Sequence, residues 1–458
     1  PEYDGVEVIE MPDEVDLGLP GTVFDSEKVL GDKIVPKGAR LIQTTWRNGV
    51  FRVVFNRPWT PTAFLKAASS LKHPIDGLMF SADSAREAAA KAVFEALTRG
   101  PTLIKAGRRA EMERWRALAE SLEEAEEKLR AAIPPDERRV LSSKRIVLFR
   151  RLLREIGYVD QGVAGRMAAG FQLCGRIEKN RAVREREPKN PFPSSRAEIC
   201  RAAAVAKEQI GEVVKPSGDD DMDRKVYEET VAEAKEGWLK GPWTADQLNS
   251  RHGRMWIPSS RFGIRQGAEG KVRVIDDLSR FGQNSTVVST DEVPLGGVDE
   301  IAGMVKLWAQ AVQPDGSVVV DCGGGRVLRG RLHQEWTPNS ARDLRGRAVD
   351  LKAAYKQLTR CRADAAFAIV AVWNPNKNEV EYYEAVALPF GGSGCVYGFN
   401  RAATALKLLV SSDFLVCQSN FYDDFPCVEP AALYDEECDP VVGALEILGW
   451  TVSTKKLK

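Results

Sequence analysis

Two short apolar segments, far apart in the sequence, each carry aspartate and together constrain how this chain can fold. Asp350 stands in Val349–Tyr355, and Asp423-Asp424 stand 73 residues further on, between Tyr422 and Phe425. Both segments have the apolar composition of strands. Hard divalent cations bind several carboxylate oxygens that come from different segments, and two such ions about 4 Å apart support phosphoryl transfer. We therefore predict a fold that brings the Asp350 segment and the Asp423 segment together, as a two-metal site needs.

The second acidic segment is predicted to lie at the tip of a hairpin. Residues 414–417 and 427–428 are apolar, and aromatic residues flank Asp423-Asp424 on both sides. Two adjacent carboxylates repel each other, so this setting favours a partly buried site that a cation compensates. The alternatives are a solvated turn for Asp423-Asp424 and a helix N-cap for Asp350.

Length and composition bound the class of protein. A chain of 458 residues is expected to form two or three domains. Lys+Arg and Asp+Glu both number 65, so net charge indicates no partner. The eight cysteines are spread singly, which predicts a reducing compartment, nucleus or cytoplasm. The three histidines lie far apart, which disfavours a His-based zinc site. No apolar run reaches the roughly 18 residues of a membrane span, so no membrane partner is expected.

We predict four regions along the chain. Residues 1–82 mix strand-like runs with turns, 83–212 are mainly helical, 213–257 are a linker and helical lead-in, and 258–458 alternate short strands with helices, as in α+β domains. Between Arg138 and Arg196, 15 Lys/Arg face 5 Asp/Glu. This excess is either a phosphate-binding face or a solvated helical surface.

Three further segments of the last region carry chemically useful residues. Alternation in residues 271–277 places Lys271 and Arg273 on one strand face, where they could bind a triphosphate. Residues 388–394, Leu-Pro-Phe-Gly-Gly-Ser-Gly, allow a close backbone approach to a nucleotide, or form a plain turn before a helix. Residues 445–456 read as a helix end, a Gly turn and a strand followed by Lys455-Lys456.

Taken in order, these five segments resemble the fingers and palm of reverse transcriptases, and most closely those of protist and algal retroelements. Residues 271–277 resemble the fingers strands, and 349–355 resemble motif A. Residues 388–394 are similar to motif B, 421–424 to the aromatic-x-Asp-Asp of motif C, and 448–456 to motif D. The upstream segments 170–175 and 235–242 are also similar to that family.

The resemblance implies an α+β, right-hand palm and fingers, with an antiparallel sheet backed by helices, after a mainly helical region. It implies an RNA-directed DNA polymerase that adds dNTPs to the 3′-OH of a primer on an RNA or DNA template. Two Mg²⁺ ions, replaceable by Mn²⁺, are implied at Asp350, Asp423 and Asp424. The implied substrate contacts are Lys271, Arg273, Phe390, Gly391, Gly392, Lys455 and Tyr355, the last as a steric gate against a ribose 2′-OH.

The sequence departs from the family's pattern at three places. Phe421 stands where tyrosine is usual in motif C, and Gly392-Ser393-Gly394 stands where one glycine is more usual in motif B. The chain begins at Pro1 and stops at Lys458, directly after motif D. We therefore expect a fragment without a thumb, which holds primer–template poorly. The alternative is a decayed reverse-transcriptase-like domain that only binds nucleic acid. A third possibility, an RNA-dependent RNA polymerase, is disfavoured by Tyr355.

Overall fold

The computed structural model describes most of the chain and divides it into two compact units, Pro1–Gly77 and Leu78–Lys458. The described residues are 5–10, 22–23, 27–30, 33–35, 37–47, 50–56, 62, 80, 82–188, 190–267, 270–435 and 437–453.

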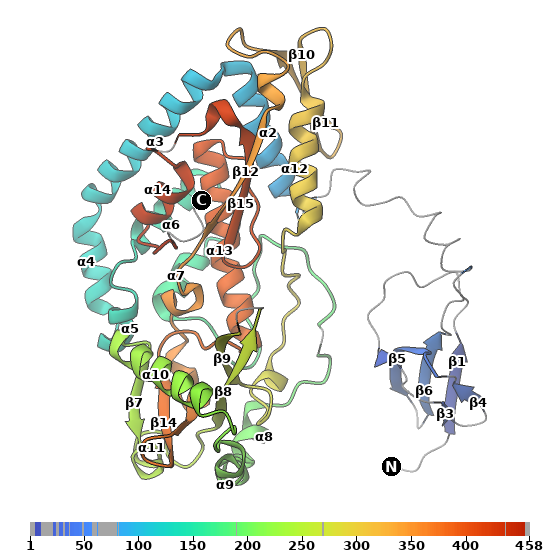
Figure 1. Ribbon diagram of the computed structural model, residues 1–458, viewed down its shortest axis with the longest axis vertical. Coiled ribbons are helices and arrows are strands. Elements are labelled where there is room, and N and C mark those ends of the chain that lie inside the picture. The colour runs from blue at the N-terminus through green and yellow to red at the C-terminus, as the bar shows by residue number, and fades with distance from the viewer. Residues whose placement is uncertain are drawn as a thin grey trace. The chain divides into compact units, whose positions relative to one another are not determined.

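The first unit contains a four-stranded sheet with the strand order β1-β6-β5-β2 (Figure 1). Strand β1 is parallel to β6, and β5 is antiparallel to β6. Val53 and Phe55, two positions apart on β6, are both buried, as expected for one face of a strand. The strands are β1 (Gly5–Glu10), β2 (Thr22–Val23), β5 (Arg40–Arg47) and β6 (Val50–Asn56), and β3 (Lys28–Leu30) forms a separate hairpin with β4 (Lys33–Val35).

The second unit begins with a run of helices, which confirms the predicted mainly helical region. Trp115 on α3 is fully buried and meets Phe414 edge-on, at a distance of 4.9 Å between ring centroids. No described helix is both long and apolar enough to cross a membrane. The helices are α2 (Asp83–Arg99), α3 (Pro101–Ser121), α4 (Glu123–Ala132), α5 (Pro135–Val140), α6 (Ile146–Glu155), α7 (Val163–Ala169), α8 (Arg196–Arg201) and α9 (Ala203–Val213).

Much of the basic excess in this region is used inside the fold. Arg145 donates to the carbonyl of Ile447, Arg186 to the hydroxyl of Tyr397, and Arg196 forms an ion pair with the buried Asp364. Arg150 and Arg151 on α6 are exposed. The local charge excess therefore overstates the positive surface that this region can offer to phosphate.

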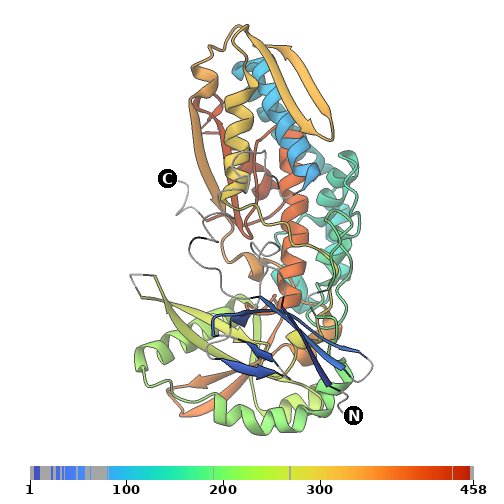
Figure 2. The same ribbon diagram turned by 90° about the vertical axis from the view of Figure 1, so that its right-hand side faces the viewer.

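Helix α13 (Ser393–Phe414) is the centre of the second unit. It is buried along nearly its whole length and runs beside strands β12 (Leu344–Asp350) and β15 (Asp424–Pro430), while α3 and α4 curve along one edge (Figures 1 and 2). Apolar residues of α3, α6, α13, β12 and β15 share one core. A second core lies among α2, α12 (Val298–Ala311) and the hairpin of β10 (Ser317–Gly323) and β11 (Arg326–Arg331).

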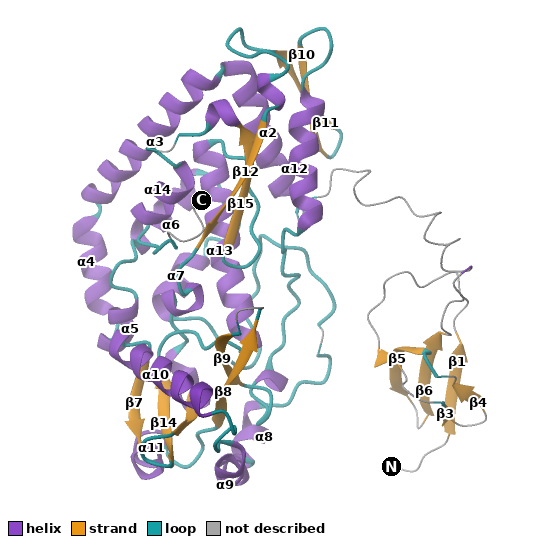
Figure 3. Ribbon diagram, in the orientation of Figure 1, coloured by secondary structure: helices purple, strands orange, loops and turns teal. Residues whose placement is uncertain are grey.

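A five-stranded sheet with the order β7-β14-β13-β8-β9 lies at the other end of this unit (Figure 3). Its pairs are antiparallel except β8–β13, which is parallel. This parallel pair departs from the antiparallel sheet that the resemblance implied. Parallel pairing is possible here because β8 and β13 are joined by a long crossover and not by a hairpin. The elements are α10 (Asp220–Glu236), β7 (Leu239–Trp243), α11 (Ala245–His252), β8 (Pro258–Gln266), β9 (Lys271–Asp277), β13 (Ile369–Asn374) and β14 (Glu379–Ala385).

Short 3₁₀ turns and one further helix complete the described chain. The turns are η3 (Asn284–Thr286), η4 (Ser340–Arg342), η5 (Ala354–Gln357), η6 (Arg362–Phe367) and η7 (Ala431–Leu433), and the helix is α14 (Pro440–Ile447). The α+β class, with antiparallel-rich sheets after a helical region, is thus confirmed.

Candidate functional site

The pairing of β12 with β15 brings the predicted acidic residues together. The strands are antiparallel, and Asp350 lies directly opposite Asp424, one step beyond the pair Val349 and Phe425. Val349 and Phe425 are buried in the core. Because side chains alternate between the two faces of a strand, both aspartates point to the opposite face, away from that core.

The turn before β15 adds the third carboxylate. Phe421 and Asp424 exchange backbone hydrogen bonds of 2.8 and 3.1 Å, which closes a hairpin with Tyr422 and Asp423 at its tip. The tip lies one residue earlier than the predicted Asp423-Asp424, because Asp424 is already the first residue of β15. Tyr422 has a φ of +52°, a left-handed conformation that a bulky residue rarely adopts. The backbone N–H of Leu351 donates to the carbonyl of Asp423 at 3.1 Å, so the tip is tied to the segment that carries Asp350.

The result is a compact cluster of three half-buried carboxylates. One oxygen each from Asp350, Asp423 and Asp424 lies within 4.8 Å of the others. Carboxylate oxygens from different segments are the ligands that hard divalent cations prefer, and a cation also offsets the repulsion between like charges at this spacing. The cluster can therefore hold a metal ion.

A short segment after α14 pairs with the other edge of the Asp350 strand. Leu351 forms an antiparallel bridge with Val452. The N–H of Ser453 donates to the carbonyl of Asp350 at 2.7 Å, and the N–H of Lys352 donates to that of Thr451 at 3.0 Å. Asp350 therefore lies between β15 and the segment 451–453. Lys455, predicted to act just after this segment, lies outside the described residues.

Three aromatic rings and one guanidinium form a contact chain beside the carboxylates. The Tyr355 ring stacks on Phe399 of α13, with 4.7 Å between centroids and 20° between planes. Phe390 meets Tyr355 edge-on at 5.8 Å, and the guanidinium of Arg273 lies 5.8 Å from the centroid of Phe390. Burial raises the pKa of Tyr355, and the charge of Asp423 adds to the rise. The contacts thus bring three predicted substrate residues together.

Strand β9 presents Lys271 and Arg273 on its exposed face, as the alternation predicts. Val272 and Val274, on the other face, pack against the main core. Across the hairpin, Arg273 lies opposite Ile264. The two cations therefore face solvent from one surface, as a binder of phosphate requires.

A buried ion network, which sequence reasoning missed, fixes β9 relative to the turn that carries Tyr355. Arg261 on β8 pairs with Asp276 at 2.7 Å and with Glu233 at 2.9 Å, and Glu233 also pairs with Lys356 at 2.9 Å. Burial alone would raise the pKa of Glu233, but Lys356 and Arg261 together hold it below its usual value. The four charged residues of this network gave no signal in the sequence, because they lie on four separate segments and meet only in the fold.

The glycines of residues 388–394 are required by packing within the protein. Gly391 has a φ of +121°, and a Cβ there would stand 2.1 Å from the carbonyl oxygen of Asp276. The N–H of Asp276 donates to the carbonyl of Phe390 at 3.0 Å. At Gly392, a Cβ would meet the Cys395 sulfur at 2.8 Å. Gly391 therefore lets this loop lie directly on β9, which places Phe390 beside Arg273.

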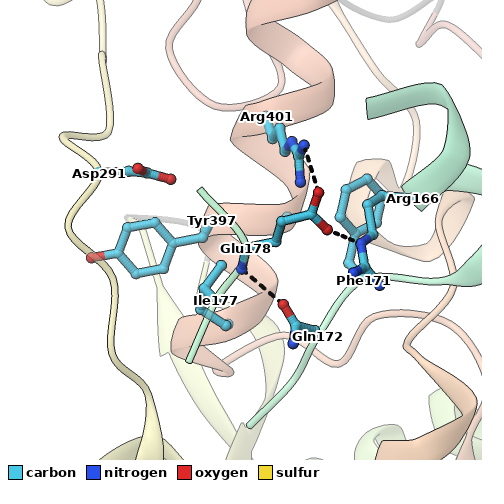
Figure 4. A pocket seen from close by; sticks show the side chains of 10 residues that line it. Arg166, Phe171, Gln172, Ile177, Glu178, Asp291, Tyr397 and Arg401 are labelled. Carbon is cyan, nitrogen blue, oxygen red and sulfur yellow. Dashed lines mark hydrogen bonds and ion pairs between the residues drawn. The ribbon is translucent and has the colours of Figure 1, made fainter. Parts of the chain in front are cut away.

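A small cavity against the N-terminal half of α13 can be set aside as a substrate site (Figure 4). Its volume is about 10 Å³, enough for a single water at most. Glu178 bonds Arg166 and Arg401 there, and its N–H donates to the side chain of Gln172 at 2.8 Å. These contacts fasten residues 171–178 to the helix.

No protein-family model matches this chain, and no curated protein matches it. The basis for its function is therefore the geometry of its own residues.

Proposed function

We propose that this chain is an RNA-directed DNA polymerase, which transfers a dNTP to the 3′-OH of a primer at the cluster of Asp350, Asp423 and Asp424. The observation that carries the proposal is this cluster, set at the end of two paired strands and beside Tyr355. Three convergent carboxylates suit a pair of Mg²⁺ ions. Such ions activate the attacking oxygen and stabilise the leaving one.

The neighbouring residues support a nucleoside triphosphate as the substrate. Arg273 and Lys271 offer positive charge on the exposed face of β9, where they would bind the phosphates. Phe390 links this face to Tyr355 through its ring contacts. A nucleotide whose phosphates lie on β9 and whose reacting phosphorus lies at the carboxylates would pass its sugar over Tyr355.

The ring of Tyr355 supports deoxyribose over ribose. Its stacking on Phe399 and edge contact with Phe390 restrain the ring from turning away. A restrained bulky ring leaves little room for a 2′-OH, so a ribonucleotide is rejected by a steric clash. This selectivity separates the proposal from an RNA-dependent RNA polymerase, which should accept NTPs.

Primer extension on an RNA template with dNTPs and Mg²⁺ tests the proposal. The parent should extend the primer, and Asp423→Asn should lose at least about a thousandfold in rate, because the metal centre supplies most of the charge stabilisation. Asp246→Asn, at an exposed site on α11, is the matched control and should keep full activity.

Calorimetric titration with Mn²⁺ accompanies the assay. The parent should bind the ion more tightly than Asp423→Asn does. Binding of metal and nucleic acid without any extension would instead support a domain that only binds nucleic acid. Extension with NTPs as efficient as with dNTPs would contradict the assignment to DNA synthesis.

A further inference from the structure

A lysine of the N-terminal helical region is buried beside the chain segment that pairs with the Asp350 strand. Lys144 lies between α5 and α6 and is only 3% exposed. Its Nζ donates to the carbonyl of Gly449 at 2.7 Å and to Oε1 of Gln357 at 3.0 Å. The ammonium also lies 4.8 Å from the ring centroid of Trp450. One side chain thus contacts both the turn after the Asp350 strand and the segment that pairs with it.

Gln357 in turn forms hydrogen bonds with both of these segments. Its Nε2 donates to the carbonyls of Lys352 at 2.8 Å and Thr451 at 2.9 Å. Its Oε1 accepts from the N–H of Thr451 at 2.9 Å as well as from Lys144. The amide therefore bridges residues 352 and 451, which already form a backbone hydrogen bond beside Asp350.

Burying Lys144 is costly for the fold. Its hydrogen-bond acceptors are neutral groups, namely a carbonyl, an amide and, at 3.4 Å, the hydroxyl of Ser143. Burial lowers the pKa of Lys144 to about 7, since removing a charged amine from water is unfavourable. An apolar side chain of similar length would fill this space without that cost.

We propose that Lys144 is a positioning residue of the acidic centre: with Gln357 it holds residues 451–453 in register on the strand that carries Asp350. Its effect on catalysis rests on the function proposed above, but its effect on strand pairing does not. Costly groups retained in a fold are concentrated at functional sites, and this lysine is next to one. The N-terminal helices thereby take a direct part in building the centre.

Lys144→Met separates this role from a merely structural one. Both acceptors keep another donor in the variant, because Ser143 Oγ donates to the Gly449 carbonyl at 2.8 Å and the N–H of Thr451 donates to Gln357. No acceptor is orphaned and the buried charge is removed. The midpoint of thermal unfolding should therefore stay the same or rise.

Hydrogen exchange supplies the direct readout of strand pairing. The amides of Lys352 and Ser453, which donate across the two strands, should exchange about tenfold faster in Lys144→Met, because a local constraint of hydrogen-bond strength is lost. Lys128→Met, which removes an exposed lysine on α4, should leave both rates unchanged. Gln357→Met is the second variant and should accelerate the same two amides.

Primer extension completes the test. Lys144→Met should lower kcat several-fold with little change in KM for dNTP, because the metal centre is affected and the nucleotide contacts are not. Unchanged exchange at Lys352 and Ser453, or a large loss of thermal stability, would overturn the inference. If the parent fails to extend primers, the proposed function fails, while the exchange experiment still decides the role of Lys144.

Discussion

The acidic centre and the ion network under β9 use the same kinds of residue in opposite ways. In the network, Arg261 and Lys356 are matched with Asp276 and Glu233, and all four side chains are buried. In the centre, three groups of one sign gather within 4.8 Å and remain half exposed. The charges of the network are buried and paired with opposite charges, whereas the carboxylates of the centre are concentrated where a cation can reach them.

Stability measurements should separate the two regions most clearly. Glu233→Gln should lower the free energy of unfolding by about 3–5 kcal/mol, because it leaves buried cations without their partner. Asp423→Asn should leave that free energy unchanged or raise it, because it removes repulsion between carboxylates. Urea unfolding at neutral pH measures both effects.

Glu229→Gln, on the exposed face of the same helix α10, is the control for Glu233→Gln and should have little effect. If Asp423→Asn destabilised the protein as much as Glu233→Gln, the distinction between structural and chemical charges would not hold.

Sugar selectivity tests the aromatic contacts that join the two regions. Tyr355→Ala should reduce the preference for dATP over ATP, measured as the ratio of kcat/KM values, by about 10- to 100-fold, because the steric barrier to a 2′-OH is removed. Phe399→Leu should reduce it less, since Tyr355 stays but loses the ring on which it stacks. Tyr434→Ala, where the ring contacts Arg347 instead, is the control. An unchanged ratio in Tyr355→Ala would contradict the assignment of Tyr355 as a steric gate.

The buried Lys144, whose hydrogen-bond acceptors among the described residues are all neutral, is a third kind of charge and gives the smallest predicted effect. Burial lowers its pKa from the ordinary lysine value of 10.5 to about 7 in the folded protein. Between these values the unfolded chain binds more protons, so stability rises with pH. The gain attributable to Lys144 should be about 1 kcal/mol between pH 7 and pH 8. Urea unfolding at both values checks it, with the difference between parent and Lys144→Met isolating this residue. An equal pH dependence in both proteins would show that Lys144 does not titrate there.

The two acidic segments could be recognised from local signals, whereas their meeting in one centre was implied by the resemblance. The apolar composition of the two segments predicted strands, and the apolar residues that flank Asp423-Asp424 predicted a hairpin there. Local alternation predicted the exposed face of β9.

The reason for Gly391 could not be read from the sequence. The glycine run indicated a close approach, but the partner is the backbone at Asp276 rather than a ligand. That partner lies more than 100 positions away, and no pattern of neighbouring residues reports such a distance.

By itself, the sequence determined the α+β class and the exposed face of β9, because hydrophobic periodicity and turn composition act over a few residues. The three aspartates were singled out by a resemblance that spans several segments. Only the tertiary structure decided which distant groups support the centre: Lys144 with Gln357, Glu233 with Arg261, and Phe399 with Tyr355. Such pairs are chosen by how whole elements pack, since burial makes each charged or aromatic group depend on whichever neighbour the fold places against it.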